Sequence, residues 1–395
     1  MKAYLDNSAT TKCAPQVVDV CVKVMQEDYG NPSSKHMKGV EAENYIKDAK
    51  ETIAKTLKCQ DKEILFTSGG TESNNMAIIG TAMANKRKGN HVIVSSVEHS
   101  SVKEPFNFLE EQGFKVTYLK VDSKGIVDIE ELKNALDDET ILVSVMYTNN
   151  EIGAVEPIEE IGHIVKSYNP DIVFHVDAIQ AYGKFKIIPK KLGIDLLSVS
   201  GHKIHGPKGS GFLYIKDKTR IKPIIYGGGQ QKGMRSGTEN VPGIVGYGVA
   251  AERAARTMAE RTAKEIEVRD YLINRILTEI PNCRLNGDPV KRLPNNCNIS
   301  FEFIEGESLL IMLDMKGICA SSGSACTSGS LAPSHVLLAI GLPHEKAHGS
   351  LRLTLSEEIT KEDVDFVVEQ IKAIVDRLRS MSPLYEDYIK KQQGK

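Results

Sequence analysis

Short apolar runs alternate with amphipathic stretches through the middle of the chain, between residues 63 and 215. The apolar runs predict buried strands and lie at 64–66, 91–94, 115–119, 141–145, 172–176 and 194–199. The stretches with helical spacing lie between them, at 102–112, 129–136 and 158–167. Such alternation is typical of a mainly parallel sheet that is covered by helices on both faces.

The last third of the chain has a different pattern. Residues 256–280 are charged and amphipathic, contain no glycine or proline, and predict a helix that leaves the first unit. After it, candidate strands at 298–303, 317–320 and 350–355 and a final helix at 361–380 indicate a smaller α+β unit. We therefore predict an α/β protein with a large domain at 15–255 and a small domain formed by 1–14 and 256–395.

Composition removes several functional classes. The 395 residues are 41% hydrophobic and 26% charged, with a formal net charge of −2 and no long basic block, so neither nucleic acid nor a membrane surface is an expected partner. No apolar run approaches the roughly 20 residues of a membrane span, and a cytoplasmic protein is expected. The 7 cysteines are scattered and form no CxxC, which argues against a disulfide framework and a metal site.

The most informative residue is Lys203, which follows the predicted strand at 194–199. Asp177 stands at the end of the strand at 172–176, so both groups can reach one crevice at the carboxyl ends of neighbouring strands. Pyridoxal phosphate needs this pair, because a lysine amine forms the Schiff base and a carboxylate keeps the pyridine nitrogen protonated. Alone, each would be a surface lysine or a helix cap; together they favour a pyridoxal phosphate enzyme.

Other residues suit the same cofactor. Gly70 and Thr71 follow the run at 64–66 and open a helix, where backbone N–H groups and the helix dipole favour a phosphate. Ser200 and His202 would add side-chain donors, and His99 could stack on the ring and transfer protons. Without the cofactor, Gly-Gly-Thr-Glu would be an ordinary helix start and His99 a turn residue.

Cys326 lies in a run of small residues, 321–330, that has little to bury. We interpret it as a nucleophile on a swinging arm, which attacks a sulfur atom at the cofactor and carries it outward. Two alternatives are a flexible linker that happens to contain cysteine and a redox pair of Cys326 with Cys319.

Taken together, these segments resemble the NifS/IscS-type cysteine desulfurases, which are fold-type I pyridoxal phosphate enzymes of the class-V aminotransferase family. The matching segments span nearly the whole chain and are highly specific: 4–11, 30–34, 67–75, 98–99, 149–153, 175–180, 200–211, 235–240, 321–329 and 351–352. The resemblance implies a large domain with a mainly parallel sheet of seven-stranded type and a smaller α+β C-terminal domain. The long loop around Cys326 is similar to the branch with a mobile cysteine.

The resemblance also implies a role for each site residue. Lys203 binds the cofactor and later moves protons, Asp177 pairs with the pyridinium nitrogen, and His99 stacks on the ring. The remaining roles divide between cofactor, substrate and sulfur: Gln180 bonds the ring hydroxyl, Gly70, Thr71, Ser200, His202 and Thr238 from the other subunit hold the phosphate, Asn150 lies beside cofactor and substrate, Arg352 grips the substrate carboxylate, and Cys326 takes the sulfur as a persulfide.

The implied activity is conversion of L-cysteine to L-alanine by a homodimer, with sulfur passed to an Fe–S scaffold or another acceptor protein. Residues 382–385 resemble the segment that docks such a scaffold, although a solvated helix end explains them nearly as well. Ser8 stands where many members have alanine. The alternatives are a selenocysteine lyase or another pyridoxal phosphate enzyme of this fold, such as an aminotransferase, and a non-catalytic adaptor.

Overall fold

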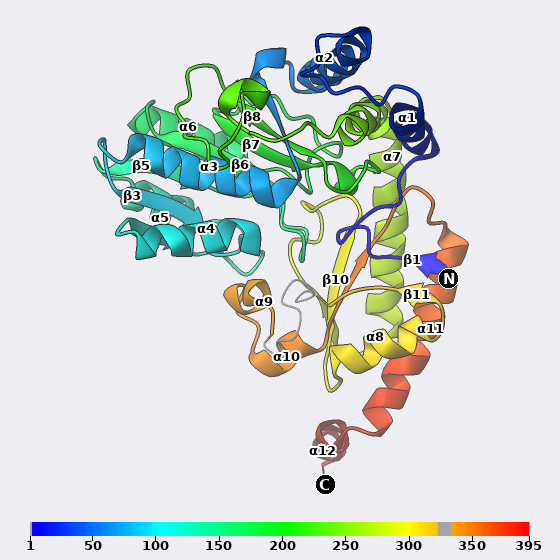
Figure 1. The fold of residues 1–395 in the computed structure, drawn as a ribbon. Coiled ribbons are helices and arrows are strands. Elements are labelled where there is room, and N and C mark those ends of the chain that lie inside the picture. The colour runs from blue at the N-terminus through cyan, green and yellow to red at the C-terminus, as the bar shows by residue number, and fades with distance from the viewer. Residues whose placement is uncertain (1, 323–332, 395) are drawn as a thin grey trace.

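The computed structural model describes residues 2–322 and 333–394, and a seven-stranded sheet is its largest element (Figure 1). The strand order is β2-β8-β7-β6-β5-β3-β4, and β8 alone runs antiparallel to its neighbours in this sheet. The strands are β2 (Ile64–Thr67), β3 (His91–Ser95), β4 (Lys115–Leu119), β5 (Thr140–Ser144), β6 (Val173–Asp177), β7 (Leu196–Ser200) and β8 (Gly211–Ile215). The predicted α/β class with a mainly parallel sheet is confirmed.

Helices cover both faces of this sheet. Successive strand residues point to opposite sides, and both sides carry apolar residues that must be buried. In β3, Ile93 joins one hydrophobic cluster, whereas Val92 and Val94 join another. The first cluster includes residues of α1 (Pro15–Gln26), α2 (Met37–Leu57), α5 (Ile129–Ala135) and α6 (Ile158–Tyr168); the second includes residues of α3 (Gly70–Asn85) and α4 (Ser100–Glu111). The continuous apolar runs in the sequence reflect this two-sided burial.

The helix expected at 256–280 begins earlier than predicted, since α7 spans Val241–Glu279. The Asn240 side chain accepts a bond from the Gly243 N–H at 3.2 Å, and Pro242 suits a first turn. Gly246 packs so closely that a Cβ there would lie 2.5 Å from the Cys21 sulfur. The glycines in the first turns of α7 thus permit tight packing, and the predicted boundary at 255/256 falls inside a continuous helix.

The remaining chain forms a second, smaller sheet region around the lower half of α7 (Figure 1). An antiparallel sheet has the order β12-β10-β9, and β1 pairs with β11 in parallel. The elements are β1 (Ala3–Tyr4), β9 (Cys283–Leu285), β10 (Asn296–Phe301), α8 (Gly306–Asp314), β11 (Ile318–Cys319), α9 (His335–Ala339), α10 (His344–His348), β12 (Ser350–Thr354), α11 (Lys361–Ser380) and α12 (Pro383–Gln392). Ala3 and Leu5 belong to the core of this region, which agrees with placing the N-terminus in the small domain; the domain bounds stay a prediction.

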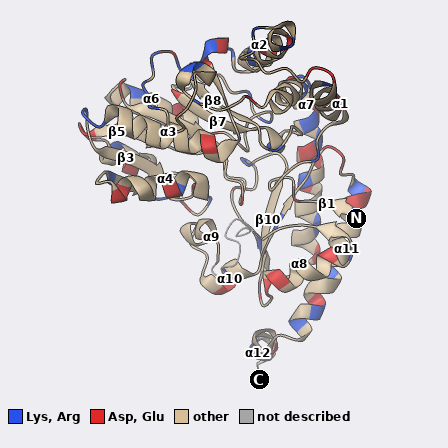
Figure 2. Cartoon of the chain, viewed as in Figure 1, with Lys and Arg blue, Asp and Glu red and all other residues tan. Residues whose placement is uncertain are grey.

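Charged side chains of both signs are interspersed along the exposed helices, including α7 and α11 (Figure 2). No helix within residues 2–322 and 333–394 has the length and apolar character needed to cross a bilayer. Six cysteines belong to the described chain, and each of them is a free thiol.

Phe301 offers a test of the smaller core, in which it is fully buried on β10. We expect Phe301→Ala to lower the free energy of unfolding by about 3–5 kcal/mol, because it removes a large buried ring and leaves a cavity. Urea unfolding followed by circular dichroism measures this. Val290→Ala is the matched control, since Val290 is 79% exposed and its truncation should change stability little. Equal effects of the two substitutions would contradict the assigned core.

Candidate active site

Lys203 lies in a single 3-10 turn, Gly201–Lys203, directly after β7. Its Nζ donates hydrogen bonds to the carbonyl of Ala9, at 2.7 Å, and to that of Ser8. The N-terminal segment is held over the turn by Thr11, whose hydroxyl donates to the His202 carbonyl at 2.8 Å. The lysine is therefore fixed by contacts with residues nearly two hundred positions away in the sequence.

Asp177 ends β6, which is the parallel neighbour of β7. One carboxylate oxygen accepts from the Asn74 amide at 2.8 Å and the other from the Ile179 N–H at 2.9 Å. Burial raises the pKa of Asp177, while these two donors and the nearby His99 and Lys203 favour its charged form. Lysine and aspartate thus reach the same sheet edge from adjacent strands.

His99 follows β3 and is the N-cap of α4. Its Nδ1 lies 2.8 Å from the Ser101 hydroxyl and accepts from the Ser101 N–H at 3.1 Å. Burial lowers the pKa of His99; the charge of Asp177 opposes this, and those of Lys203 and Arg352 add to it. The structure therefore brings all four groups within electrostatic reach of one another.

The predicted phosphate turn joins β2 to α3 at the same edge. A Cβ on Gly70 would lie 2.1 Å from Ile179 Cδ1 and 3.7 Å from the Ser200 side chain, so a larger residue there would have to displace the Ile179 side chain. Thr71 is exposed at the first turn of α3. His202 is half-buried with Nδ1 3.2 Å from the Thr10 hydroxyl, and burial, aided by nearby lysines, lowers its pKa to about 4.

Gln180 and Asn150 are buried at the rim of this region. The Gln180 amide donates to the Ser8 carbonyl at 3.0 Å, a partner that the sequence did not suggest. The Asn150 carbonyl accepts from the Arg352 guanidinium at 3.3 Å. Both residues therefore contact the segments that surround Lys203 and Arg352.

Arg352 comes from β12 of the smaller sheet and is almost fully buried. Its Nη2 forms an ion pair with Asp6 at 3.1 Å, and its charge favours the ionised form of the nearby Glu151. Burial nevertheless raises the pKa of Glu151 to about 7. Within the described chain the Arg352 Nε makes no hydrogen bond, and a buried, oriented guanidinium of this kind is suited to a carboxylate ligand.

The predicted nucleophile Cys326 lies outside the described residues. The residues that flank 323–332 are anchored near the site: Ser321 exchanges two backbone hydrogen bonds with Arg352, at 2.7 and 3.2 Å. On the other side, the Ser334 hydroxyl donates to Glu151 and the His335 ring bonds the Glu98 carbonyl at 3.0 Å. The chain before residue 323 therefore lies beside Arg352, and the chain after residue 332 lies beside Glu98, the residue before His99.

Thr238 is exposed, in a segment that contacts the phosphate turn of its own chain through an Arg235–Glu72 ion pair at 2.8 Å. Binding of the cofactor phosphate by Thr238 of a second copy would require an assembly of two chains, and this role stays a prediction.

The sequence pattern suggested no role for Asn74, Ser101 or Asp6, which bond to Asp177, His99 and Arg352 respectively. It also suggested none for Glu151, which accepts from Ser334 and lies within electrostatic reach of Arg352. Three of them lie in the segments that matched the family, yet their side-chain directions depend on the rotation of helices and turns. Ser101 offered only a weak signal, as a serine near a helix start.

The arrangement fits pyridoxal phosphate. Three buried polar atoms beside the site make no hydrogen bond within the described chain: the Ser8 hydroxyl, Asn74 Oδ1 and Arg352 Nε. A glycine cradle, a lysine amine and a buried carboxylate supply what the phosphate, the aldehyde carbon and the ring nitrogen each require.

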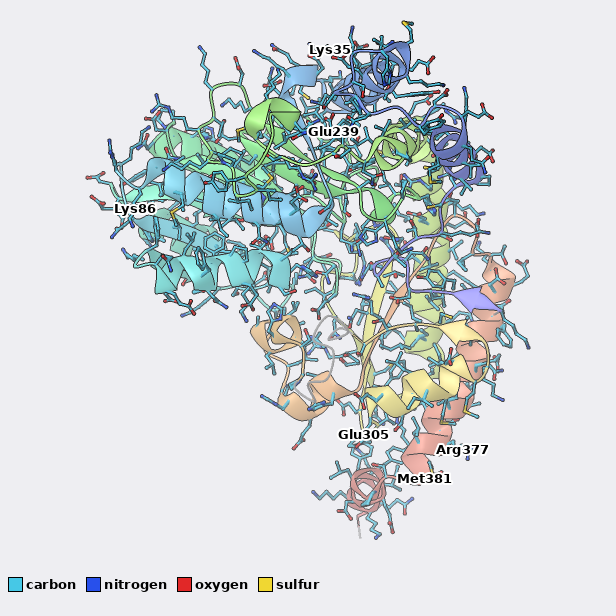
Figure 3. The ribbon with its side chains drawn as sticks, in the orientation of Figure 1. Lys35, Lys86, Glu239, Glu305, Arg377 and Met381 are labelled. Atoms are coloured by element: carbon cyan, nitrogen blue, oxygen red, sulfur yellow. The ribbon has the colours of Figure 1, made fainter. Side chains whose placement is uncertain are left out.

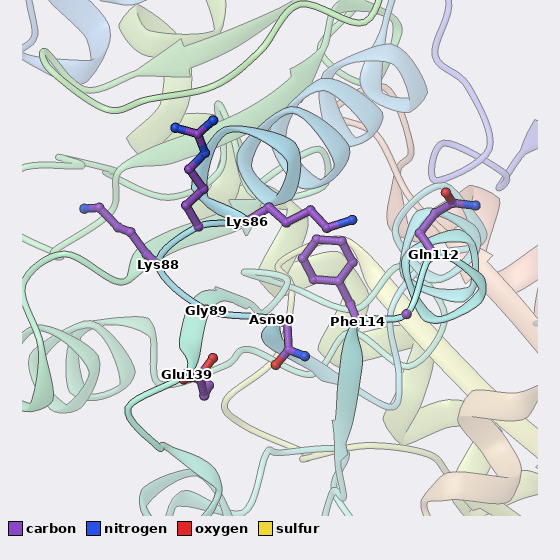
Figure 4. A pocket seen from close by; sticks show the side chains of 9 residues that line it. Lys86, Lys88, Gly89, Asn90, Gln112, Phe114 and Glu139 are labelled. Carbon is purple, nitrogen blue, oxygen red and sulfur yellow. The ribbon is translucent and has the colours of Figure 1, made fainter.

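Two further hollows lie away from Lys203. One, of about 430 Å³, is lined by Lys86, Lys88 and Phe114 among others and precedes β3 and β4, so it is at the sheet edge opposite His99 (Figure 4). The other is a groove of about 1010 Å³ between α8, α10, α11 and α12. Glu305 and Met381, labelled in Figure 3, line this groove, as do Ser322 and Pro333.

Residues 3–367 match the family described as Aminotransferase class-V. The chain belongs to this family. As a class-V aminotransferase of the NifS/IscS type, it is 52% identical to Cysteine desulfurase IscS of Clostridium botulinum over 100% of this chain and 99% of that protein. It is 53% identical to Cysteine desulfurase IscS of Methanosarcina thermophila, over 96% and 94%. A solved structure titled NIFS-LIKE PROTEIN superimposes with a TM-score of 0.90 at 38% identity, covering 95% of this chain and 100% of that one. Enzymes of this family use pyridoxal phosphate.

Glu151 gives this class-V aminotransferase a testable pH dependence. Its pKa rises from 4.5 to about 7 on folding, so it contributes stability below pH 4.5 that is lost as the pH rises towards 7. We expect the total loss of stability to be about 3 kcal/mol smaller in Glu151→Gln than in the wild type, because only the contribution of Glu151 is removed. Urea unfolding at pH 4.5 and pH 8 measures it, with the exposed Glu139→Gln as control. An unchanged pH dependence in Glu151→Gln would refute the buried acid.

Proposed function

We propose that this protein is a pyridoxal phosphate-dependent cysteine desulfurase that converts L-cysteine to L-alanine and takes up the sulfur as a persulfide on Cys326. The observation that supports this best is the convergence of Lys203, Asp177, His99 and Arg352 on one sheet edge. The proposal also follows from the relatives named Cysteine desulfurase IscS, which match the whole chain.

Each of the site residues would bind a different part of the cofactor. Lys203 would hold it covalently through Nζ, Asp177 would pair with the ring nitrogen and Gln180 with the ring hydroxyl. The phosphate would be bound by the following group: Gly70, Thr71, Ser200, His202 and Thr238 of a second copy. Bound in this way, the group supplies an electron-withdrawing ring that stabilises negative charge on the substrate α-carbon.

The protein's own groups would then act on L-cysteine. Arg352, held by Asp6, would fix the substrate carboxylate through charge-assisted hydrogen bonds. Lys203 Nζ would take the α-proton and return a proton, with His99 as the second acid–base group. The Cys326 thiolate would attack the substrate sulfur; the S–S bond forms as the C–S bond breaks, which leaves L-alanine and a persulfide without any external oxidant.

We further propose a homodimer that works in the cytoplasm and donates sulfur to an Fe–S scaffold or another acceptor protein. The free thiols of the described cysteines suit a reducing compartment. The groove beside α12 is the proposed dock, because it is bordered by Ser322 and Pro333 and contains the exposed Leu384. Tyr385 and Tyr388 pack on Phe303 and would hold α12 in place.

Cys326→Ser tests the sulfur transfer. We expect the purified variant to keep its yellow, borohydride-reducible chromophore and to lose sulfide release from L-cysteine, because the hydroxyl cannot accept the sulfur as a persulfide. Alanine and sulfide are assayed with a thiol reductant. Cys319→Ser is the control and should stay active; its inactivity would favour a redox pair. Full activity of Cys326→Ser would refute the proposed nucleophile.

The Lys203→Ala variant tests the proposed enzyme against the alternative functions. We expect alanine formation to fall by about 10²–10⁴-fold or more, because the acid–base group and the covalent link to the cofactor are both lost. A wild type that consumes L-selenocysteine and leaves L-cysteine intact would favour a selenocysteine lyase. A Lys203→Ala protein that retains every cellular function of the wild type would favour an adaptor.

Leu384 tests the dock. Leu384→Glu should lower the transfer of ³⁵S to an Fe–S scaffold protein while sulfide release to a small thiol stays at the wild-type level, because the change affects the groove and not the site. Val290→Glu, on another exposed surface, is the matched control. Equal ³⁵S transfer by both variants would show that the scaffold protein binds elsewhere.

A further inference from the structure

Asn74 links two of the proposed site residues from a position on α3, where it is fully buried. Its Nδ2 donates one hydrogen bond to Asp177 Oδ2 at 2.8 Å and another to the Ser101 hydroxyl at 2.9 Å. The opposite orientation of the amide would place its carbonyl against the Asp177 carboxylate, where two acceptors would repel. The hydrogen bonds therefore assign the NH₂ group to this side.

The direction of the next bond follows from the first. The Ser101 oxygen accepts from Asn74, so its hydrogen is available to His99 Nδ1, which lies 2.8 Å away. The Ser101 backbone N–H also donates to Nδ1, at 3.1 Å. A nitrogen that faces two donors must be an acceptor, and in neutral imidazole the proton is then on Nε2.

We propose that Asn74 and Ser101 are positioning residues that hold His99 as a neutral imidazole with its proton on Nε2, and that the same amide holds the Asp177 carboxylate. This inference rests on the proposed function, in which both groups act on the cofactor. It confines proton exchange by His99 to Nε2. It also joins the two groups through one side chain, so a change at Asn74 affects both.

The surroundings of His99 agree with a neutral ring. It is faced by Asp177 from β6, Lys203 from the turn after β7, Arg352 from β12 and His335 from α9. Only Asp177 among these groups favours an imidazolium, and its carboxylate is already engaged by two donors. Protonation of the His99 ring would also place a hydrogen on Nδ1, and this N–H would face the Ser101 N–H, so that two donors would repel each other.

Histidine-selective ¹⁵N labelling of the holoenzyme tests the tautomer, with His99→Gln to identify the signal. At pH 7 we expect the couplings of a ring protonated on Nε2. Ser101→Ala should raise the titration midpoint of His99 by about 0.5–1 pH unit, because one donor to the neutral form is lost. Ser101→Thr, which keeps the hydroxyl, should restore the wild-type midpoint.

Ser100→Ala is the matched control, since within the described chain the Ser100 hydroxyl makes no hydrogen bond, and its midpoint should equal the wild-type value. A ring protonated on Nδ1, an imidazolium at pH 7, or an unshifted midpoint in Ser101→Ala would each overturn the proposal. The proposed function fails separately, when wild-type holoenzyme forms no alanine from L-cysteine although the ring signals are as expected.

Asn74 provides a second measurement that does not use activity. Asn74→Ala removes a donor to a buried carboxylate, so the dissociation constant of pyridoxal phosphate from the refolded or reconstituted protein should rise by about 10-fold, while the circular dichroism spectrum stays native. Asn75→Ala changes a half-buried neighbour on α3 whose amide donates to the Thr71 carbonyl of the same helix, and this variant should bind as the wild type does. Equal affinities of the two variants would show that Asn74 does not position Asp177.

Discussion

The buried carboxylate of Asp177 is the constraint around which the site is built. An ionised group that is 5% exposed must be met by donors or opposite charge, since an unpaired buried charge is far too costly to persist. The structure meets it from one side with the Asn74 amide and the Ile179 N–H. The charge of Lys203 and the ring of His99 complete its surroundings. The close fit of α3 against this end of the sheet agrees with this bond, because Gly70, at the start of the same helix, lies against Ile179.

The N-terminal segment joins the two sheet regions at this site. The Asn7 amide donates to the Thr354 carbonyl at 2.8 Å, and the Ser8 N–H donates to the Thr354 hydroxyl at the same distance. The carbonyl of Ser8 accepts from Gln180 and from Lys203. A few residues therefore connect the strand of Arg352 to the turn of Lys203. This explains why a segment so far from the lysine in sequence belongs to the motifs of the family.

Buried acids form a second layer behind the site. Glu98 accepts from the Ser95 hydroxyl and the Met146 N–H, and Glu151 accepts from Ser334. Burial raises the pKa of both carboxyls. They contact the turns that hold His99 and Asn150, and Ser334 and His335 rest against them. The chain on the far side of 323–332 is thereby attached to the same layer that shapes the cofactor region.

The sequence alone determined six of the seven strands of the large sheet, their alternation with helices, and the positions of Lys203 and Asp177 at strand ends, because these follow from local apolar periodicity; β8, the antiparallel strand, was not among the predicted strands. Only the tertiary structure decided that α7 begins at Val241, since its glycines pack on Cys21 and α2 and do not break the helix. Only it could join Asn74 to Asp177, 103 positions apart. Which side chains converge depends on strand order and on the rotation of each helix about its axis, and both are set by packing between distant segments.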